Sequence, residues 1–352
     1  MLSLSGLWPN VALLVAAALL IGYVGPKLSR TADKMGKITG MGDTVAGAIF
    51  LGAATSLPGI VASLRSAANG QPTLAVGTAI GSIAAQTMFI GLADVALRRG
   101  TITAEQTVSD SLMQTAVLVS QLSLVLVAML ASSYAIWGVH PVSPVIIVGG
   151  VLGFRAIQGE QRTPHWRATN ENHDLPPEGP KDEEDEEAEG DQEATGHVVG
   201  RFGLYVVLVF IGGWFINTSA NGIMEATGWS PVIVGSTLMG ITTSFPELVT
   251  AISAVRQDRV GLAIGDIVGG NAFDTMVVAT SDFFFREGSV YNALDANIHL
   301  LNALAILMTG LLLGGFIRRE RRGPGNIGVE SYLILLTYLA GIAVIIFFGG
   351  RQ

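Results

Sequence analysis

The chain has 352 residues, of which half are hydrophobic and 44 are glycine, and its mean hydropathy is +0.52. This composition is typical of a polytopic membrane protein and gives no reason to expect a soluble globular core. The chain has no cysteine, which excludes disulfides, thiolate metal sites, thiol nucleophiles and palmitoylation. The net charge of −8 is uneven, because residues 158–199 hold 13 acids and 3 bases.

Ten apolar windows are long enough to cross a hydrocarbon core of about 30 Å. They lie near residues 8–25, 43–66, 73–97, 108–131, 134–156, 201–221, 231–255, 260–283, 297–317 and 330–349. The fifth window is interrupted by His140, Pro141 and Pro144, so its helix could start several residues later. No convincing cleavage site follows the first window, so we expect a retained helix rather than a signal peptide.

An acidic segment divides the chain into residues 1–157, 158–199 and 200–352. The acids between residues 181 and 193 cannot bury a core, so we expect a disordered cytoplasmic linker; a low-affinity calcium sensor is the alternative. Each flanking part has five predicted spans, an odd number, so the second must lie upside down in the membrane. The predicted fold is an all-α polytopic membrane protein with two inverted five-helix repeats.

Basic residues predict the orientation of these spans, because Lys and Arg are enriched on the cytoplasmic side of membrane proteins. Twelve fall at one end of the spans, namely Lys27, Arg30, Lys34, Lys37, Arg98, Arg99, Arg256, Arg259, Arg318, Arg319, Arg321 and Arg322. Only Arg65, Arg286 and Arg351 fall at the other. We therefore expect both termini outside and the acidic segment inside, in a plasma (inner) membrane.

The seventh span contains a proline and an acid. A carboxylate at the centre of a spanning helix costs about 2.5–3.5 kcal/mol on insertion scales, so Glu247 needs a partner, a proton or a cation. Pro246 has no amide hydrogen, so the carbonyl of Thr242 loses its helical donor and the helix should break there. A bound cation would satisfy the freed carbonyls, the neighbouring hydroxyls and the carboxylate. The alternative is a simple kink with a structurally paired Glu247.

An internal repeat supports the cation hypothesis. A shift of 188 residues aligns residues 42–94 with 230–282 without a gap, and 14 of the 53 pairs are identical. The identities include Gly47/Gly235, Gly52/Gly240, Thr55/Thr243, Ser56/Ser244, Pro58/Pro246, Gly77/Gly265, Gly81/Gly269, Thr87/Thr275, Met88/Met276 and Asp94/Asp282. Repeated helix breaks, predicted here at Pro58 and Pro246, are typical of secondary transporters whose site lies between the halves near mid-membrane.

The two blocks resemble the alpha-repeats of the cation/calcium exchanger superfamily, to which sodium/calcium exchangers belong. Each repeat there carries a Gly-Thr-Ser-Leu-Pro-Glu-like helix break, which is similar to Ala-Thr-Ser-Leu-Pro-Gly at residues 54–59 and Thr-Thr-Ser-Phe-Pro-Glu at residues 242–247. A second family block, Gly-Asn-x-x-Gly-Ser-Asn-x-x-Asn/Asp, is similar to residues 77–86 and 265–274.

The resemblance implies a sodium- or proton-driven antiporter whose cation sites are lined by acids, hydroxyls and carbonyls. Carried over by position, the cation ligands are Thr55, Ser56, Ser82, Gln86, Thr243, Ser244, Glu247, Asn271 and Asp274, with the backbone carbonyls of Gly52 and Gly240. Asp266 and Asp43 are further candidates. The resemblance implies no organic cofactor; Ca²⁺ and Na⁺ are the expected transported ions, with H⁺ or K⁺ as alternatives.

Three positions depart from the family pattern. Gly59 stands where the family has the acid that pairs with Glu247, Gln86 stands where an Asn or Asp is expected, and Gly270 replaces a Ser. Glu247 and Asp274 then give the site a charge of about −2 if both are ionised. Hard dications prefer several carboxylates, so such a site would bind calcium weakly, favour monovalent ions, or recruit another acid.

The recruited acid would be Asp43 or Asp266. Asp266 precedes Asp274 by eight residues, which is about 12 Å along a helix. The two cannot share one ion unless that helix bends.

The sequence thus predicts a secondary active cation antiporter, exchanging calcium for sodium, whose partners are inorganic cations and the lipid bilayer. The alternative within transport is a proton-coupled or monovalent cation antiporter, since burial disfavours an unpaired carboxylate. A non-transporting membrane cation sensor is the alternative from another class. No histidine lies in the repeats to activate a serine, and we find no phosphate loop, zinc motif or nucleotide fingerprint, so neither an enzyme nor a nucleic-acid partner is expected. The oligomeric state stays open.

Overall fold

The computed structural model describes residues 5–39, 52–97, 100–105, 108–162, 195–256, 260–319 and 323–349. These residues form helices and connecting turns, with one isolated bridge between Ile136 and Val139. The first half contains α1 (Leu7–Thr39), α3 (Gly52–Ala68), α4 (Pro72–Ala96), α5 (Ile102–Glu105), α6 (Val108–Leu130) and α7 (Val142–Arg162). The second contains α8 (Thr195–Thr227), α9 (Pro231–Ile233), η3 (Val234–Met239), α10 (Gly240–Thr243), α11 (Phe245–Arg256), α12 (Val260–Phe284), η4 (Val290–Ala293), α13 (Ala296–Arg318), η5 (Pro324–Asn326) and α14 (Val329–Gly349).

Described helices lie in each of the ten predicted spans, although residues 43–51 of the second span are outside the described residues. Within the described residues, six helices are individually long and apolar enough to cross a membrane, and the bent segment from Pro231 to Arg256 makes a seventh. The other three are α3, α7 and α12. In α7 the apolar part, Val142–Ile157, is short, and α12 carries three acids. The polytopic helical fold is confirmed, and the helices that fall short of a simple span include two of those that carry the site.

Two boundaries differ from the prediction. The fifth span begins at Val142 rather than at residue 134, because Trp137 and Gly138 have positive φ angles of 53° and 83° and form a tight turn. Helices also reach into both ends of the predicted linker, since α7 continues to Arg162 and α8 begins at Thr195. Hydropathy marks the membrane-crossing part of a helix and not its end. The acidic run itself lies outside the described residues.

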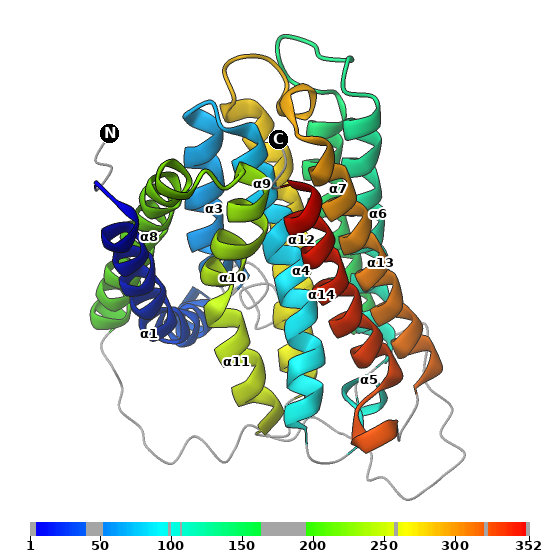
Figure 1. The fold of residues 1–352 in the computed structure, drawn as a ribbon. Helices are drawn as coiled ribbons and strands as arrows, with labels where there is room; N and C mark the ends of the chain where they lie inside the picture. The colour runs from blue at the N-terminus through cyan, green and yellow to red at the C-terminus, as the bar shows by residue number, and fades with distance from the viewer. Residues whose placement is uncertain are drawn as a thin grey trace, which may run out of the picture.

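The two halves are inverted relative to each other. Corresponding helices of the repeats, such as α4 and α12 or α6 and α13, run in opposite directions (Figure 1). The last described helix, α14, ends toward the upper end of the bundle, and α8 begins lower than it ends (Figure 1). An odd number of spans in each half produces this arrangement, as predicted.

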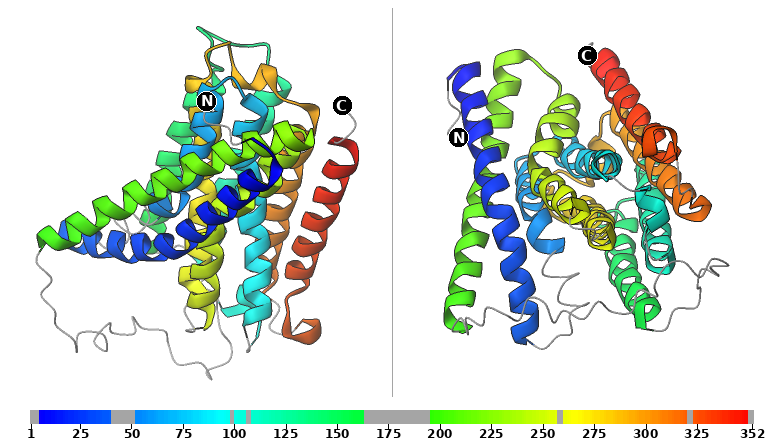
Figure 2. Two further views of the ribbon diagram at one scale, coloured as in Figure 1. Left: turned by 60° about the vertical axis from the view of Figure 1, so that its left-hand side comes forward. Right: turned by 90° about the horizontal axis from the view of Figure 1, so that it is seen from below.

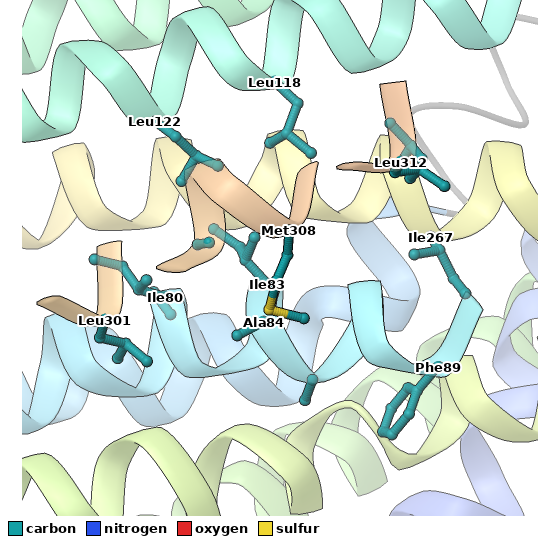
Figure 3. Packing of buried hydrophobic residues seen from close by; sticks show 14 of the residues in the cluster. Ile80, Ile83, Ala84, Phe89, Leu118, Leu122, Ile267, Leu301, Met308 and Leu312 are labelled. Carbon is teal, nitrogen blue, oxygen red and sulfur yellow. The ribbon is translucent and has the colours of Figure 1, made fainter. Parts of the chain in front are cut away.

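The centre of the bundle is α4, which is buried along almost its whole length. Its polar side chains are buried as well as its apolar ones, because other helices surround it. Ile80 and Ile83 of α4 face Leu118 of α6 and Met308 of α13 in one apolar cluster (Figure 3). This packing holds α4 rigidly, and the polar side chains on its other side are therefore held at fixed positions.

Helices α1 and α8 lie side by side and cross the other helices obliquely (Figure 2). Each crosses the proline of the opposite half. A Cβ built on Gly25 of α1 would lie 2.7 Å from Pro246 Cβ, and one built on Gly213 of α8 would lie 2.8 Å from the carbonyl oxygen of Pro58. Gly25 and Gly213 are separated by the same 188 residues as the two prolines. The repeat therefore extends into the oblique pair, and each proline segment is packed by the other half.

This crossing gives a first prediction. Gly213→Ala should lower the melting temperature of the purified protein, because its methyl group meets backbone that cannot move aside, at a cost of about 1–3 kcal/mol. The measurement is thermal unfolding in detergent. Gly203→Ala is the matched control, since Gly203 is exposed on the same helix and alanine is the better helix former. Equal melting temperatures for the two variants would contradict the tight crossing.

Candidate cation site

The predicted helix break in the second half is present. Helix α10 ends at Thr243, Ser244 has a turn conformation with φ −93° and ψ 8°, and α11 begins at Phe245. The segments on either side are bent by 44°, and the π-helical turn η3 precedes the break. Pro246 lies at the start of α11, where its missing amide removes a helical bond. The break lies inside the bundle, where Ser244 and Glu247 are 1% and 0% exposed.

The first half differs. Helix α3 runs without interruption from Gly52 to Ala68 and contains Pro58, so the break predicted at Pro58 is not seen within it. Pro58 has no amide hydrogen to donate to the carbonyl of Ala54, so α3 continues through this position with that backbone bond missing.

Helix α4 touches the broken segment closely. A Cβ on Gly240 would lie 2.7 Å from the carbonyl carbon of Gly81, and a Cβ on Gly81 would lie 2.6 Å from Ser236 Cα. Only glycine permits these approaches. The Ser82 hydroxyl consequently lies 3.1 Å from Thr243 Oγ1 and 3.4 Å from the Gly240 carbonyl oxygen. The repeated glycines thus bring the polar residues of both halves together.

Gln86 joins the two halves further along α4. Its Nε2 donates to Ser244 Oγ at 3.1 Å and to Asp274 Oδ2 at 3.0 Å. On α12, Asn271 donates from Nδ2 to Thr87 Oγ1 at 3.1 Å. The ligands predicted from Ser82, Gln86, Thr243, Ser244, Asn271 and Asp274 are therefore gathered at one place, each no more than 2 % exposed.

Several buried oxygens in this region have no hydrogen-bond partner. They are both carboxylate oxygens of Glu247, the hydroxyl of Ser56, Oε1 of Gln86, Oδ1 of Asn271 and Oδ1 of Asp266. Most buried polar atoms in folded proteins have a partner, because an unpaired one costs about 1–3 kcal/mol. Unpaired acceptors gathered in one region are suited to a cation, which accepts lone pairs from all of them.

The carboxylates have no positive partner among the described residues. Glu247 is fully buried and lies within electrostatic range of both Asp266 and Asp274, while no described cationic side chain acts on any of the three. Asp266 accepts a hydrogen bond from the neutral hydroxyl of Thr250, and Asp274 accepts one from the neutral amide of Gln86. The described residues form no group of three acids or histidines close enough to hold one metal ion. When ionised, these carboxylates therefore carry negative charge that no described cationic side chain neutralises, and the three do not converge on a single ion position.

Gly59 also faces this region. A Cβ on Gly59 would lie 3.7 Å from Thr243 Oγ1 and 3.9 Å from Ser82 Oγ, which are ordinary contact distances. The position at which the family pattern has its second acid therefore points at the site and has room for a side chain. Gly52 and Thr55 lie in α3, but their side-chain surroundings, like Asp43 altogether, are outside the described residues.

Some participants were not singled out from the sequence. Thr275 donates to Gln121 Oε1 of α6, and Thr87 receives the Asn271 amide. The identity of Thr87 and Thr275 across the repeat was the signal that could have found both. Gln121 lies outside the repeat and carried no signal. Asp94 and Asp282, identical across the repeat, lie apart from the site.

Asp94 and Asp282 accept hydrogen bonds from the connections between helices. Asp94 accepts from the amides of Ile102 and Gly328 at 2.7 Å, and Asp282 accepts from those of His140 and Val290 at 2.7 Å. Carboxylates that accept backbone amides in this way stabilise the connections between helices. Their role is structural.

Comparison with known proteins places this arrangement in a family. The profile of the family described as sodium/calcium exchanger protein matches residues 9–155 and 197–348. The inner membrane protein YrbG of Escherichia coli (strain K12) is 24% identical over 346 residues, covering 95% of this chain and 98% of that protein. The sodium/calcium exchanger MaX1 of Methanosarcina acetivorans is 24% identical over 132 residues, 37% of each chain.

The fold is also that of a solved exchanger. A structure of the sodium-calcium exchanger NCX_Mj superposes with a TM-score of 0.58 at 18% identity, covering 95% of this chain and 98% of that one. The family is one of membrane transporters and not of enzymes. With both repeats matched by the family profile and the whole chain matched by the fold, this protein belongs to the sodium/calcium exchanger family.

Proposed function

We propose that this protein is a secondary active antiporter that exchanges calcium for sodium by alternating access. The observation that carries the proposal is the state of Glu247, a fully buried carboxylate whose two oxygens have no hydrogen bond and no cationic neighbour among the described residues. Such a group is stable within a membrane only if it holds a cation or a proton. Its position at the junction of two inverted halves is where a secondary transporter binds its substrate.

The proposed ligands come from both halves. Asp274 and Glu247 would supply charge, and neutral oxygens would come from the hydroxyls of Ser56, Ser82, Thr243 and Ser244, from Gln86 Oε1, from Asn271 Oδ1 and from the carbonyl of Gly240. Thr55 and the carbonyl of Gly52 are proposed from their positions in the sequence repeat alone. These are hard oxygen ligands, which suit sodium and calcium alike. No ligand depends on a cofactor.

One observation favours a second candidate function. Gln86 directs its amide hydrogens toward Asp274 and Ser244, so donors occupy part of the space where a dication would need oxygens. With Gly59 in place of an acid, the site has fewer negative charges than a calcium site usually needs. A proton or a monovalent cation as the exchanged ion would fit this reduced charge.

The membrane arrangement completes the proposal. We place residues 1–157 and 200–352 as two repeats on either side of the segment 158–199. Helix α13, which ends at Arg318, runs toward the lower end of the bundle in Figure 1, and we assign this end to the cytoplasm of a plasma (inner) membrane. Both termini would then lie outside.

The test is calcium uptake into proteoliposomes that hold the purified protein, loaded in parallel with sodium, potassium or acidic buffer. The proposal expects uptake only with an outward sodium gradient. Uptake with protons or potassium instead would support the second candidate. Absence of uptake under every gradient, with cation binding retained, would reject exchange and indicate a membrane cation sensor.

A further inference from the structure

All three acids of the site belong to the second half. The equivalent positions in the first half, 188 residues earlier, are neutral: Gly59 corresponds to Glu247, Thr78 to Asp266 and Gln86 to Asp274. Thr78 is fully buried and donates to the carbonyl of Leu74 at 2.7 Å, so its role is local. The repeat equivalent of Asp266 therefore needs no charge to fill its structural role, and the carboxylate at residue 266 calls for a different explanation.

Asp266 is connected to Glu247 through Thr250. The Thr250 hydroxyl lies 2.9 Å from Asp266 Oδ2 and 3.1 Å from the carbonyl oxygen of Glu247. The other carboxylate oxygen of Asp266 is buried without a partner, as are both of Glu247. Three unpaired carboxylate oxygens thus accompany one hydroxyl, and all come from α11 and α12.

This group is separate from Asp274. Helix α12 is continuous from Val260 to Phe284, so the eight residues between Asp266 and Asp274 correspond to about 12 Å along its axis. The helix shows no break that would let both bind one ion. Glu247 interacts electrostatically with both Asp266 and Asp274, so it can contribute to an ion position beside either acid.

We propose that Glu247, Thr250 and Asp266 form a second cation-binding position for calcium, in which Asp266 supplies the carboxylate that Gly59 lacks. The inference rests on the proposed function, because it assumes that the site binds calcium. Two carboxylates match the charge of one Ca²⁺ ion, and the ion removes the cost of burying them. Because α12 starts at the lower end of the bundle, this position is displaced toward that end relative to Asp274 (Figure 1).

The experiment measures equilibrium binding of radioactive Ca²⁺ to the purified protein in detergent, without a transport step. Asp266→Asn should weaken binding by at least about tenfold, which corresponds to ~1.4 kcal/mol. Glu225→Gln is the matched control, because Glu225 is exposed on α8 and loses the same charge away from the site. Asp266→Asn protein that folds and binds Ca²⁺ with wild-type affinity would overturn the inference.

A second variant tests the replacement directly. Adding Gly59→Glu to Asp266→Asn returns a carboxylate from the other side of the site and should regain most of the lost affinity. If Asp266→Asn protein does not fold, Thr250→Val tests the same position, and unchanged Ca²⁺ affinity in that variant would overturn the inference. Wild-type protein that binds Ca²⁺ but exchanges nothing would defeat the proposed function and leave this position standing.

Discussion

Glu247→Gln is expected to abolish cation exchange while leaving the protein folded, or even more stable. The variant removes a ligand charge from the site, and the loss of about 3 kcal/mol of binding energy weakens cation affinity by about 100-fold. It also removes a buried charge that has no partner among the described residues, so the free energy of unfolding should not fall. The measurements are ion-driven uptake and thermal unfolding.

The combination of the two results separates the hypotheses for Glu247. A structurally paired carboxylate would lose stability on neutralisation, because its partner would be left unpaired. Normal uptake by the variant would remove Glu247 from the transport site. The exposed Glu225→Gln variant, with the same change in net charge, should behave as wild type in both measurements.

Gly59→Glu is expected to strengthen calcium binding by about tenfold or more, since an additional carboxylate raises the preference for a dication. The structure has room for the change, because a Cβ at this position makes only ordinary contacts with Thr243 and Ser82. Glutamate also has a higher helix propensity than glycine, so α3 should tolerate it. The measurement is competition between Ca²⁺ and Na⁺ for binding to purified protein.

The control for this prediction is Gly59→Gln, which has the same shape without the charge. If Gln strengthens calcium binding as much as Glu, side-chain packing rather than charge explains the effect. If neither variant changes the Ca²⁺/Na⁺ preference, the position of Gly59 does not contribute to the ion site. A gain confined to Glu would show that the missing acid sets the cation preference of this protein.

The positions of the ten helices could be predicted from the sequence because a bilayer allows few alternatives. Apolar windows of sufficient length must form helices there, since lipid offers no partner for backbone groups. The break at Pro246 followed from the missing amide hydrogen alone. The same rule was wrong at Pro58, where α3 continues through the proline.

The membrane-protein class, the internal repeat and the helix-break motifs could be recognised from the sequence alone. The 188-residue shift and the inverted topology follow from residue spacing, Glu247 is a candidate ligand by its local chemistry, and Asp274 and Ser82 are candidates through the family resemblance. The tertiary structure alone decided which of these groups face one another. Gln86 turns donors toward Asp274, and Thr250 links Asp266 to the backbone of Glu247, because packing of α4, α11 and α12 sets the directions of their side chains. Spacing along a chain fixes the face of a helix, but the partner on that face depends on the helix packed against it.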